Sequence, residues 1–239
     1  IRWRAGFIMT NTFSKTPYDC SNKIALITGA AGLMGAQHAA ALLETGARVI
    51  ISDIDRVKLD QVKATLSSIY PEDCIIVELV DVTNSDNIEV INKKYCIDIL
   101  VNNAAVDPKV DSDMDKLKSS RFENFSEKSW KLELDVGITG AFLCTKIVGH
   151  SMALRQNGVI LNIASDLSVI APDQRIYRQE GLSEEQQPVK PVTYSVIKSA
   201  LIGLTKYTAS YWAKESVRCN ALSPGGIFNN QSHDFVDKL

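Results

Sequence analysis

The sequence lacks most of the features that would assign it to a specialised class of protein. Its 239 residues include three histidines that lie far apart and five cysteines without a CxxC pair, so we expect neither a metal site nor a disulfide framework. A formal net charge of -2 and a pI near 6.0 argue against nucleic-acid binding. No apolar run has the length of a membrane-spanning helix, so we expect no membrane partner.

What is present indicates one cytoplasmic domain. The chain is 45% hydrophobic, which is enough for a sizeable core. Residues 1–20, in which Met9 is a candidate natural start, are expected to be a leader or a disordered segment, and residues 21–239 a single domain. The cysteines are odd in number and mostly lie in apolar runs, as reduced core thiols do: Cys20, Cys74, Cys96, Cys144 and Cys219.

Short runs rich in valine, isoleucine and leucine alternate with longer stretches of helical spacing. The short runs have the composition of strands that are buried on both faces: 23–28, 47–53, 74–81, 98–104, 158–165 and 217–224. The helical stretches cover 36–46, 60–70, 129–156 and 194–215. This alternation predicts an α/β fold with a doubly wound parallel sheet and helices on both faces.

The first predicted strand-to-helix turn, TGAAGLMGAQ, carries Gly29, Gly32 and Gly35. A tight turn, a close backbone approach and close helix packing each need a residue without Cβ, and a helix N-terminus binds pyrophosphate. Asp53 closes the second strand, where a carboxylate can bind the ribose hydroxyls of a dinucleotide. The pattern predicts a Rossmann-type dinucleotide site.

Asp53 also bears on the choice of cofactor. A 2'-phosphate beside its carboxylate would be repelled by about 4 kcal/mol for unit charges 4 Å apart at an effective dielectric of 20. We therefore expect NAD, with NADP disfavoured. The alternative is that Asp53 is only a turn residue at the end of a strand.

Tyr194 and Lys198 lie four residues apart in YSVIK, so they share one face of a predicted helix. A free tyrosine titrates near 10, and bringing its pKa close to neutrality needs about 4 kcal/mol of preferential stabilisation of the anion. An ammonium group and an oxidised nicotinamide together can supply that stabilisation. The pair thus favours acid-base chemistry, although the same residues also occur in ordinary packed helices.

TGAAGLMG, VDVTN, VNNAA, Ser165 in NIASDLS, Tyr194-x-x-x-Lys198 and SPGG follow one another in this order. The sequence from residue 23 to about 230 therefore resembles the short-chain dehydrogenase/reductase family. The resemblance implies that Ser165 binds the substrate oxygen, that Tyr194 is the general acid or base, and that Lys198 binds the nicotinamide ribose and stabilises the tyrosinate. Asn102 is expected to brace the sheet.

The resemblance also implies a set of residues around a nicotinamide cofactor. Asp81 and Val82 would flank the adenine, Asn103 and Ala104 the ribose, and the SPGG segment the nicotinamide. The implied cofactor-binding residues are Gly29, Gly32, Leu33, Met34, Gly35, Asp53, Asp81, Val82, Asn103, Ala104, Tyr194, Lys198, Pro224, Gly225 and Ile227.

The sequence departs from the family pattern at three places. Gly137 stands where the family has an asparagine that holds a proton-relay water, so a backbone carbonyl serves instead, turnover is impaired, or Asp135 substitutes. The segment 166–193 is longer than usual. The chain also stops soon after SPGG, where the family continues into a last edge strand that helps to form dimers, so that strand is expected to be missing.

The long segment 166–193 is expected to recognise the substrate. Its cationic and aromatic residues would suit a phosphate, carboxylate or nucleotide-sugar group, unless they belong to a solvated charged loop: Arg175, Tyr177, Arg178 and Lys190. This segment and SPGGIFNNQ are similar to a bacterial subgroup called flagellin modification protein A, which is associated with surface-sugar biosynthesis.

The sequence thus predicts an NAD(H)-dependent oxidoreductase that interconverts a secondary alcohol and a carbonyl group. The expected substrate is a small molecule, a sugar or a nucleotide sugar that can be anionic, and the family resemblance implies a homo-oligomer, a dimer or tetramer, if the C-terminus were complete. Two alternatives stay open. One is a non-catalytic nucleotide-binding relative, and the other is a reductase of lipid, steroid or acyl substrates.

Overall fold

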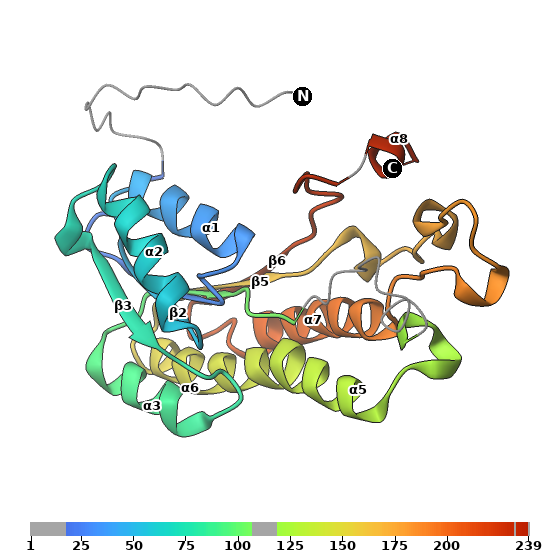
Figure 1. The fold of residues 1–239 in the computed structure, drawn as a ribbon. Coiled ribbons are helices and arrows are strands. Elements are labelled where there is room, and N and C mark those ends of the chain that lie inside the picture. The colour runs from blue at the N-terminus through green and yellow to red at the C-terminus, as the bar shows by residue number, and fades with distance from the viewer. Residues whose placement is uncertain (1–17, 107–118, 232, 239) are drawn as a thin grey trace.

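The computed structural model describes residues 18–106, 119–231 and 233–238. Within them, six parallel strands form one sheet in the order β3-β2-β1-β4-β5-β6 (Figure 1). The strands are β1 (Ile24–Thr28), β2 (Arg48–Asp53), β3 (Ile75–Leu79), β4 (Ile99–Asn102), β5 (Gly158–Ile163) and β6 (Val217–Leu222). The predicted sheet is confirmed, including all six strands and the reversal of strand order beside β1.

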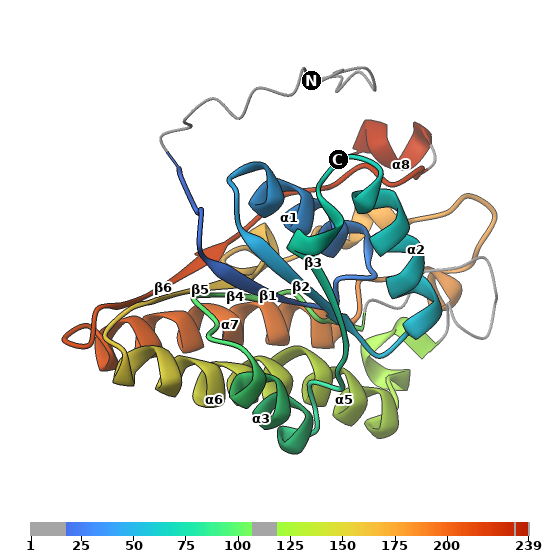
Figure 2. The same cartoon turned by 90° about the vertical axis from the view of Figure 1, so that its left-hand side faces the viewer.

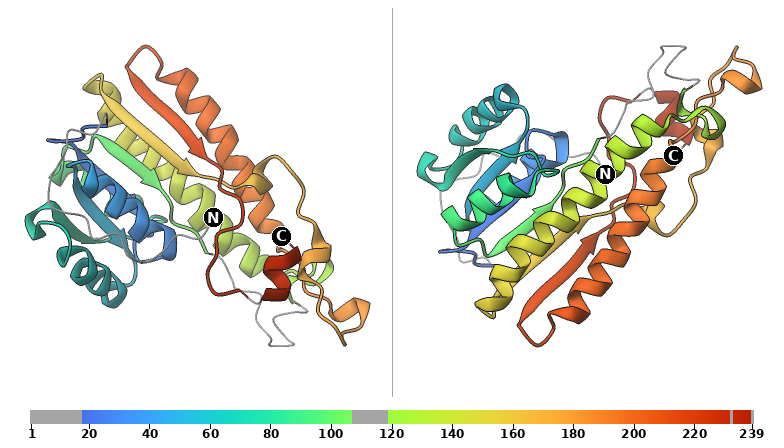
Figure 3. Two further views of the ribbon diagram at one scale, coloured as in Figure 1. Left: turned by 90° about the horizontal axis from the view of Figure 1, so that it is seen from above. Right: turned by 90° about the horizontal axis from the view of Figure 1, so that it is seen from below.

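Helices cover both faces of this sheet. On one face lie α1 (Leu33–Glu44) and α2 (Arg56–Ser67). On the other face lie α3 (Ser85–Lys94), α5 (Glu127–Leu134), α6 (Gly140–Leu154) and α7 (Val192–Tyr211) (Figure 2). Seen from above and from below, α1 and α2 lie over the β1–β3 side, whereas α6 and α7 run beneath β4, β5 and β6 (Figure 3). The structure is therefore the predicted doubly wound α/β sandwich.

Each face of the sheet has its own apolar core. One core joins the strands to α1 and α2 through residues such as Ala39, Leu43 and Leu59. The other joins them to α3, α6 and α7 and includes Val148 and Met152, both fully buried. Because β1 and β4 are covered on both sides, their sequences are continuous apolar runs without alternation.

Local signals in the sequence determine where individual helices begin. The Asp55 side chain caps α2 by accepting the Lys58 N–H, and the Asn84 side chain caps α3 by accepting the Asp86 N–H. The predicted helices over 36–46, 60–70 and 194–215 are present with shifted ends as α1, α2 and α7. Two further helices, α3 and α8 (His233–Lys238), were not predicted.

The predicted helix 129–156 contains one irregular turn. Between α5 and α6, residues Asp135–Thr139 form a π-helical turn, labelled η3, in which the Gly140 N–H donates to the Asp135 carbonyl. Such single π turns are rare and occur often at functional sites. Among the described residues, no helix combines the length and apolar character needed to cross a bilayer.

Candidate active site

The predicted site residues lie at the carboxyl edge of the sheet. In a parallel sheet all strands end at the same edge, so the segments that follow β1, β2, β4, β5 and β6 converge there. The glycine turn follows β1, Asp53 ends β2, and Asn103 follows β4. Ser165 follows β5, Pro224 follows β6, and Tyr194 and Lys198 lie in the first half of α7.

The glycine turn leaves no room for side chains. Gly29 has a φ of +63°, and a Cβ there would lie 2.7 Å from the Cα of Ala104. A Cβ on Gly35 would lie 2.4 Å from the carbonyl oxygen of Gly29. The first turn of α1 therefore packs directly on the loop before it, and the exposed N-terminus of the helix can accept an anionic group.

Asn103 has a structural role that the sequence analysis missed. Its Nδ2 donates to the carbonyls of Thr28 and Gly29, both at 2.9 Å. In return, Thr28 Oγ1 accepts the N–H groups of Asn103 and Ala104, both at 3.1 Å. These bonds tie the end of β4 to the glycine turn, so Asn103 helps to fix the shape of that turn.

Asp53 accepts hydrogen bonds from the same turn and has acceptor positions left for a ligand. Its Oδ2 accepts the Ala31 N–H at 3.1 Å, and its Oδ1 accepts the Asp55 N–H at 3.1 Å. A carboxylate has about four acceptor positions, so two remain for hydroxyl donors. The glycine cradle and this carboxylate therefore fit the adenosine half of a dinucleotide.

The other residues expected around the adenine and the phosphates differ in exposure. Leu33 is half exposed at the start of α1, and Met34, the next residue of this helix, packs against the apolar core. The Asp81 carboxylate accepts the N–H and the hydroxyl of Thr83. The side chain of Val82 is buried against Gly140, so only the backbone of Val82 can face a ligand.

Tyr194 and Lys198 are brought to the end of β5. The Lys198 ammonium is buried, donates to the Ile163 carbonyl at 2.7 Å, and lies 5.6 Å from the centre of the Tyr194 ring. One residue further along α7, the Ser199 hydroxyl donates to the Ser168 carbonyl at 3.1 Å. These bonds hold the first turns of α7 beside the segment that carries Ser165.

The Ser165 hydroxyl is held by its immediate neighbours. Ser165 caps the short helix η4 (Asp166–Ser168), and its Oγ accepts the Leu167 N–H at 3.2 Å. The same hydroxyl donates to Asp166 Oδ1 at 2.8 Å. Ser165 is only 3% exposed. Its rotamer is therefore set by η4 and by the carboxylate beside it.

A second ammonium group approaches Tyr194 from the long loop. Lys190 Nζ lies 3.7 Å from the centre of the Tyr194 ring, closer than Lys198. An ammonium over an aromatic face is attracted by the ring, and the attraction grows when the phenol is ionised. Two ammonium groups therefore lie close to the Tyr194 ring.

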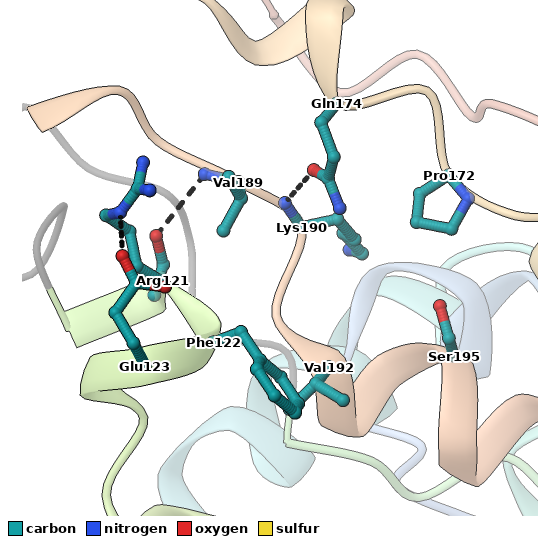
Figure 4. A pocket seen from close by; sticks show the side chains of 10 residues that line it. Arg121, Phe122, Glu123, Pro172, Gln174, Val189, Lys190, Val192 and Ser195 are labelled. Carbon is teal, nitrogen blue, oxygen red and sulfur yellow. Dashed lines mark hydrogen bonds and ion pairs between the residues drawn. The ribbon is translucent and has the colours of Figure 1, made fainter. Parts of the chain in front are cut away.

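Lys190 also lines a pocket of about 390 Å³ beside Tyr194 (Figure 4). Apolar side chains form part of its wall and polar groups the rest. Ser195, the residue after Tyr194, points into it from α7. The lining residues are Ser120, Arg121, Phe122, Glu123, Pro172, Gln174, Val189, Lys190, Val192 and Ser195.

Most of the residues that were expected to bind an anionic substrate group have other partners in the structure. Arg175 is exposed and pairs with Asp173, whose pKa it lowers to about 2 through its hydrogen bonds. Arg178 likewise binds Glu184. Tyr177 packs on Phe235 of α8 at 5.5 Å between ring centres. Of the four residues expected to grip an anion, only Lys190 lines the pocket.

The long loop is an ordered structure built around Gln187. This side chain is buried, accepts the Gln179 N–H at 2.9 Å, and donates to the carbonyls of Gln179 and Leu182 at 3.0 and 2.9 Å. The loop is joined to its surroundings where Arg121 donates to the Glu184 carbonyl at 2.9 Å. These bonds support the part of the loop that leads to the pocket wall.

Gly137, which replaces the expected asparagine, lies inside the π turn η3. A Cβ at this position would lie 2.8 Å from Cγ2 of Ile197, so the Ile197 side chain occupies the space of the missing side chain. Asp135 is exposed, whereas Gly137 is buried, so Asp135 does not substitute for the asparagine. A further contact that no sequence motif predicts is made by the buried carboxylate of Glu133, which accepts a hydrogen bond from Thr193, the residue before Tyr194.

Comparison with known families identifies the chain. Residues 23–177 match the family model described as short chain dehydrogenase. The chain belongs to this family. Residues 182–237 match a related model described as enoyl-(acyl carrier protein) reductase. As a short-chain dehydrogenase, the protein is an oxidoreductase that acts on CH–OH or carbonyl groups of a small molecule with a nicotinamide cofactor.

Similar short-chain dehydrogenases act on different substrates. An NAD-dependent glycerol dehydrogenase of Listeria innocua is 31% identical over 212 residues, which cover 87% of this chain and 71% of the relative. A 7alpha-hydroxysteroid dehydrogenase of Bacteroides fragilis is 30% identical over 86% of this chain and 72% of its own length. A solved 3-oxoacyl-(acyl-carrier protein) reductase with bound NAD from Brucella melitensis has a TM-score of 0.73 and 25% identity, and covers 87% of this chain and 72% of that structure.

Proposed function

We propose that this short-chain dehydrogenase is a cytoplasmic, NAD(H)-dependent enzyme that interconverts a secondary alcohol and a carbonyl group on a polar, sugar-like substrate. The observation that carries the proposal is the position of Tyr194. Its ring lies near the ammonium groups of Lys198 and Lys190, its helix is hydrogen-bonded to η4 beside Ser165, and Lys190 also lines a pocket with polar and apolar walls. Residues 21–239 would act as one catalytic domain.

Tyr194 is the residue that moves a proton in this proposal. The phenol of Tyr194 gives a proton to the substrate oxygen in reduction and takes it back in oxidation, while Ser165 binds the same oxygen. Two ammonium groups lie 3.7 and 5.6 Å from the centre of its ring, where they would favour the phenolate over the neutral phenol. Acid-base catalysis of this kind contributes about 10²- to 10⁴-fold to the rate.

A nicotinamide cofactor bound at this edge would supply or accept the hydride. Gly29, Gly32 and Gly35 would hold its pyrophosphate and Asp53 its adenosine ribose, with Leu33, Met34, Asp81, Val82, Asn103 and Ala104 around them. Pro224, Gly225 and Ile227 would border the nicotinamide, and Lys198 would bind its ribose. The Asp53 carboxylate favours NAD over NADP because it repels a 2'-phosphate.

The pocket wall supports a substrate rich in hydroxyl groups. Lys190 and Ser195 supply polar groups to a wall that also contains apolar side chains such as Val192, and the hydroxyl groups of a sugar can hydrogen-bond to the polar ones. The glycerol dehydrogenase relative acts on a polyol by its name, which agrees with this direction. A sugar or nucleotide sugar of surface-polysaccharide or flagellin-glycan biosynthesis is the substrate class that we propose.

Exposed aromatic residues on α6 and α7 support the proposal of a homo-oligomer. Phe142 is 48% exposed, and Tyr207 and Tyr211 are 66% and 64% exposed on the outer side of α7. Exposed large apolar side chains of this kind are candidates for a subunit contact. Sedimentation at several concentrations would test it, and a monomer at all of them would contradict it.

The decisive test replaces Tyr194 by phenylalanine. We expect turnover of alcohol and carbonyl probes to fall by at least about 10²-fold, because the proton donor is lost. NADH binding should be nearly unchanged, because the glycine turn and Asp53 are untouched. Unchanged turnover in Tyr194→Phe would contradict the assignment of the catalytic residue.

Cofactor choice is tested by thermal unfolding with NADH and with NADPH at equal concentration. A ligand at a hundredfold excess over its dissociation constant stabilises the folded state by about 2.7 kcal/mol. For a chain of this size this corresponds to a rise of about 5–11 °C in the melting temperature. We expect this rise with NADH and little change with NADPH, and the reverse order would contradict the role of Asp53.

A further inference from the structure

Asp166 has a position that neither the family pattern nor the proposed roles explain. Its backbone N–H donates to the Pro224 carbonyl at 3.1 Å, which joins η4 to the segment after β6. Its Oδ1 accepts the Ser165 hydroxyl at 2.8 Å and the Leu167 N–H at 2.7 Å. Asp166 is thus a half-buried carboxylate directly between the expected substrate-binding serine and the SPGG segment.

The bond to Asp166 determines what Ser165 can offer a substrate. A hydroxyl group has one hydrogen and two acceptor positions. In Ser165 the hydrogen points to Asp166 Oδ1, and one acceptor position is used by the Leu167 N–H. What remains is one acceptor position, which suits the hydroxyl of an alcohol, whereas binding of a carbonyl oxygen requires the Ser165 hydrogen to turn from Asp166 to the substrate.

The second carboxylate oxygen of Asp166, Oδ2, faces the SPGG segment. Asp166 Oδ2 lies 3.8 Å from the point that a Cβ on Gly225 would occupy, within ordinary contact distance of the SPGG segment. No described residue donates a hydrogen bond to Oδ2 in this arrangement. A half-buried carboxylate oxygen gains from a hydroxyl donor, and hydrogen bonds to charged groups are stronger than those between neutral groups.

We propose that Asp166 is a specificity-determining residue that selects vicinal diols. Ser165 binds the oxygen on the reacting carbon, and Asp166 Oδ2 accepts the hydroxyl on the adjacent carbon. This geometry is available because Oδ1 of the same carboxylate already contacts Ser165 Oγ. The inference rests on the proposed function, and it narrows the substrate to molecules with neighbouring hydroxyl groups.

The test compares butane-2,3-diol with butan-2-ol, which differ by one hydroxyl on the adjacent carbon. Binding of both probes is followed by NMR titration with NAD⁺ present and absent, and their kcat/KM values are measured with NAD⁺. The variant Asp166→Asn keeps the shape and removes the charge. Asp173→Asn is the matched control, because it removes a negative charge from the same loop at a carboxylate that, among the described residues, pairs only with Arg175.

We expect the wild-type chain to prefer the diol by about 10- to 100-fold, the value of a hydrogen bond to a charged group. Asp166→Asn should lose most of this preference while the melting temperature and the NADH affinity stay close to those of wild type, and Asp173→Asn should keep it. Equal binding of the two probes by the wild type, or an unchanged preference in Asp166→Asn, would overturn the inference.

Failure of the proposed function has a different signature. It would appear as absence of turnover with either probe and absence of a thermal shift with NADH. The NMR titrations without cofactor still measure discrimination between the diol and the alcohol in that case. If Asp166→Asn does not fold, Asp166→Glu keeps the charge and displaces it by one methylene. A preference for the diol that Asp166→Glu leaves unchanged would then overturn the inference.

Discussion

The two sides of the carboxyl edge are built from different parts of the chain. On the side proposed for the nucleotide, the glycine turn is tied down by Asp53 and Asn103, and its shape depends on the absence of side chains at Gly29 and Gly35. On the substrate side, side chains form the site, and its shape depends on hydrogen bonds such as those of Gln187 and Asp166. The nucleotide side therefore tolerates almost no change at a few positions, whereas the substrate side can change its specificity by single replacements.

The largest effect is expected when a methyl group is added to the glycine turn by Gly35→Ala. Gly35→Ala places a Cβ 2.4 Å from the Gly29 carbonyl oxygen. Overpacking of this kind costs about 1–3 kcal/mol, which lowers the melting temperature by about 2–12 °C. NADH affinity should fall with it, as isothermal titration would show.

Gly203→Ala is the matched control for this change. Gly203 lies in α7, and a Cβ there would have no heavy atom within 4 Å. Replacing a glycine inside a helix by alanine should stabilise the fold by about 0.5–1 kcal/mol. Equal losses of NADH affinity in Gly35→Ala and Gly203→Ala would remove the distinction between the two sites.

On the substrate side, Gln187→Ala should weaken substrate binding without affecting the cofactor. The change leaves backbone groups of Gln179 and Leu182 unpaired, at a cost of about 1–3 kcal/mol. We expect KM for the alcohol to rise while the thermal shift with NADH is unchanged. Gln186→Ala is the control, since that side chain only caps the short helix η6 (Glu184–Gln186) through Ser183. A fall in NADH affinity in Gln187→Ala would show that the two sides are not independent.

The smallest effect is expected from Lys190→Met. A cation over a ring contributes about 0.5–2 kcal/mol, and one pKa unit corresponds to about 1.4 kcal/mol. Removing the cation raises the pKa of the Tyr194 phenol, so the pH profile of alcohol oxidation should move to higher pH by up to about one unit. Lys190→Arg should keep the wild-type profile. A profile that Lys190→Met leaves in place would show that Lys190 does not act on Tyr194.

The difference between the two sides also explains what the sequence could predict. The six strands and the glycine turn follow from local composition and spacing, and the structure has them. The helix α3 was missed although Asn84 caps it and Ile88 and Ile91 face the core, because the polar residues between them hid the pattern. Local signals were therefore sufficient for most of the fold.

The contacts on the substrate side join residues that are distant in sequence, and no local pattern reveals them. Thr193 binds Glu133 sixty positions away, and Arg121 binds the Glu184 carbonyl sixty-three positions away. The pairing of Arg175 with Asp173, by contrast, was readable from their spacing and argues for a charged surface loop rather than an anion site. The sequence thus predicts the glycine turn from local spacing, whereas the contacts of the long loop need the structure.

The π turn between α5 and α6 gives this helix one residue more than a regular helix of the same length would have. Each residue of an α-helix turns the chain by about 100° around the axis. Deleting one residue from Asp135–Thr139 would therefore rotate α5 by about that angle relative to α6 and carry Glu133 away from Thr193. The face that α5 presents to α7 is thus determined by the length of a single turn, and an insertion or deletion there would redirect eight residues of helix without altering any of them.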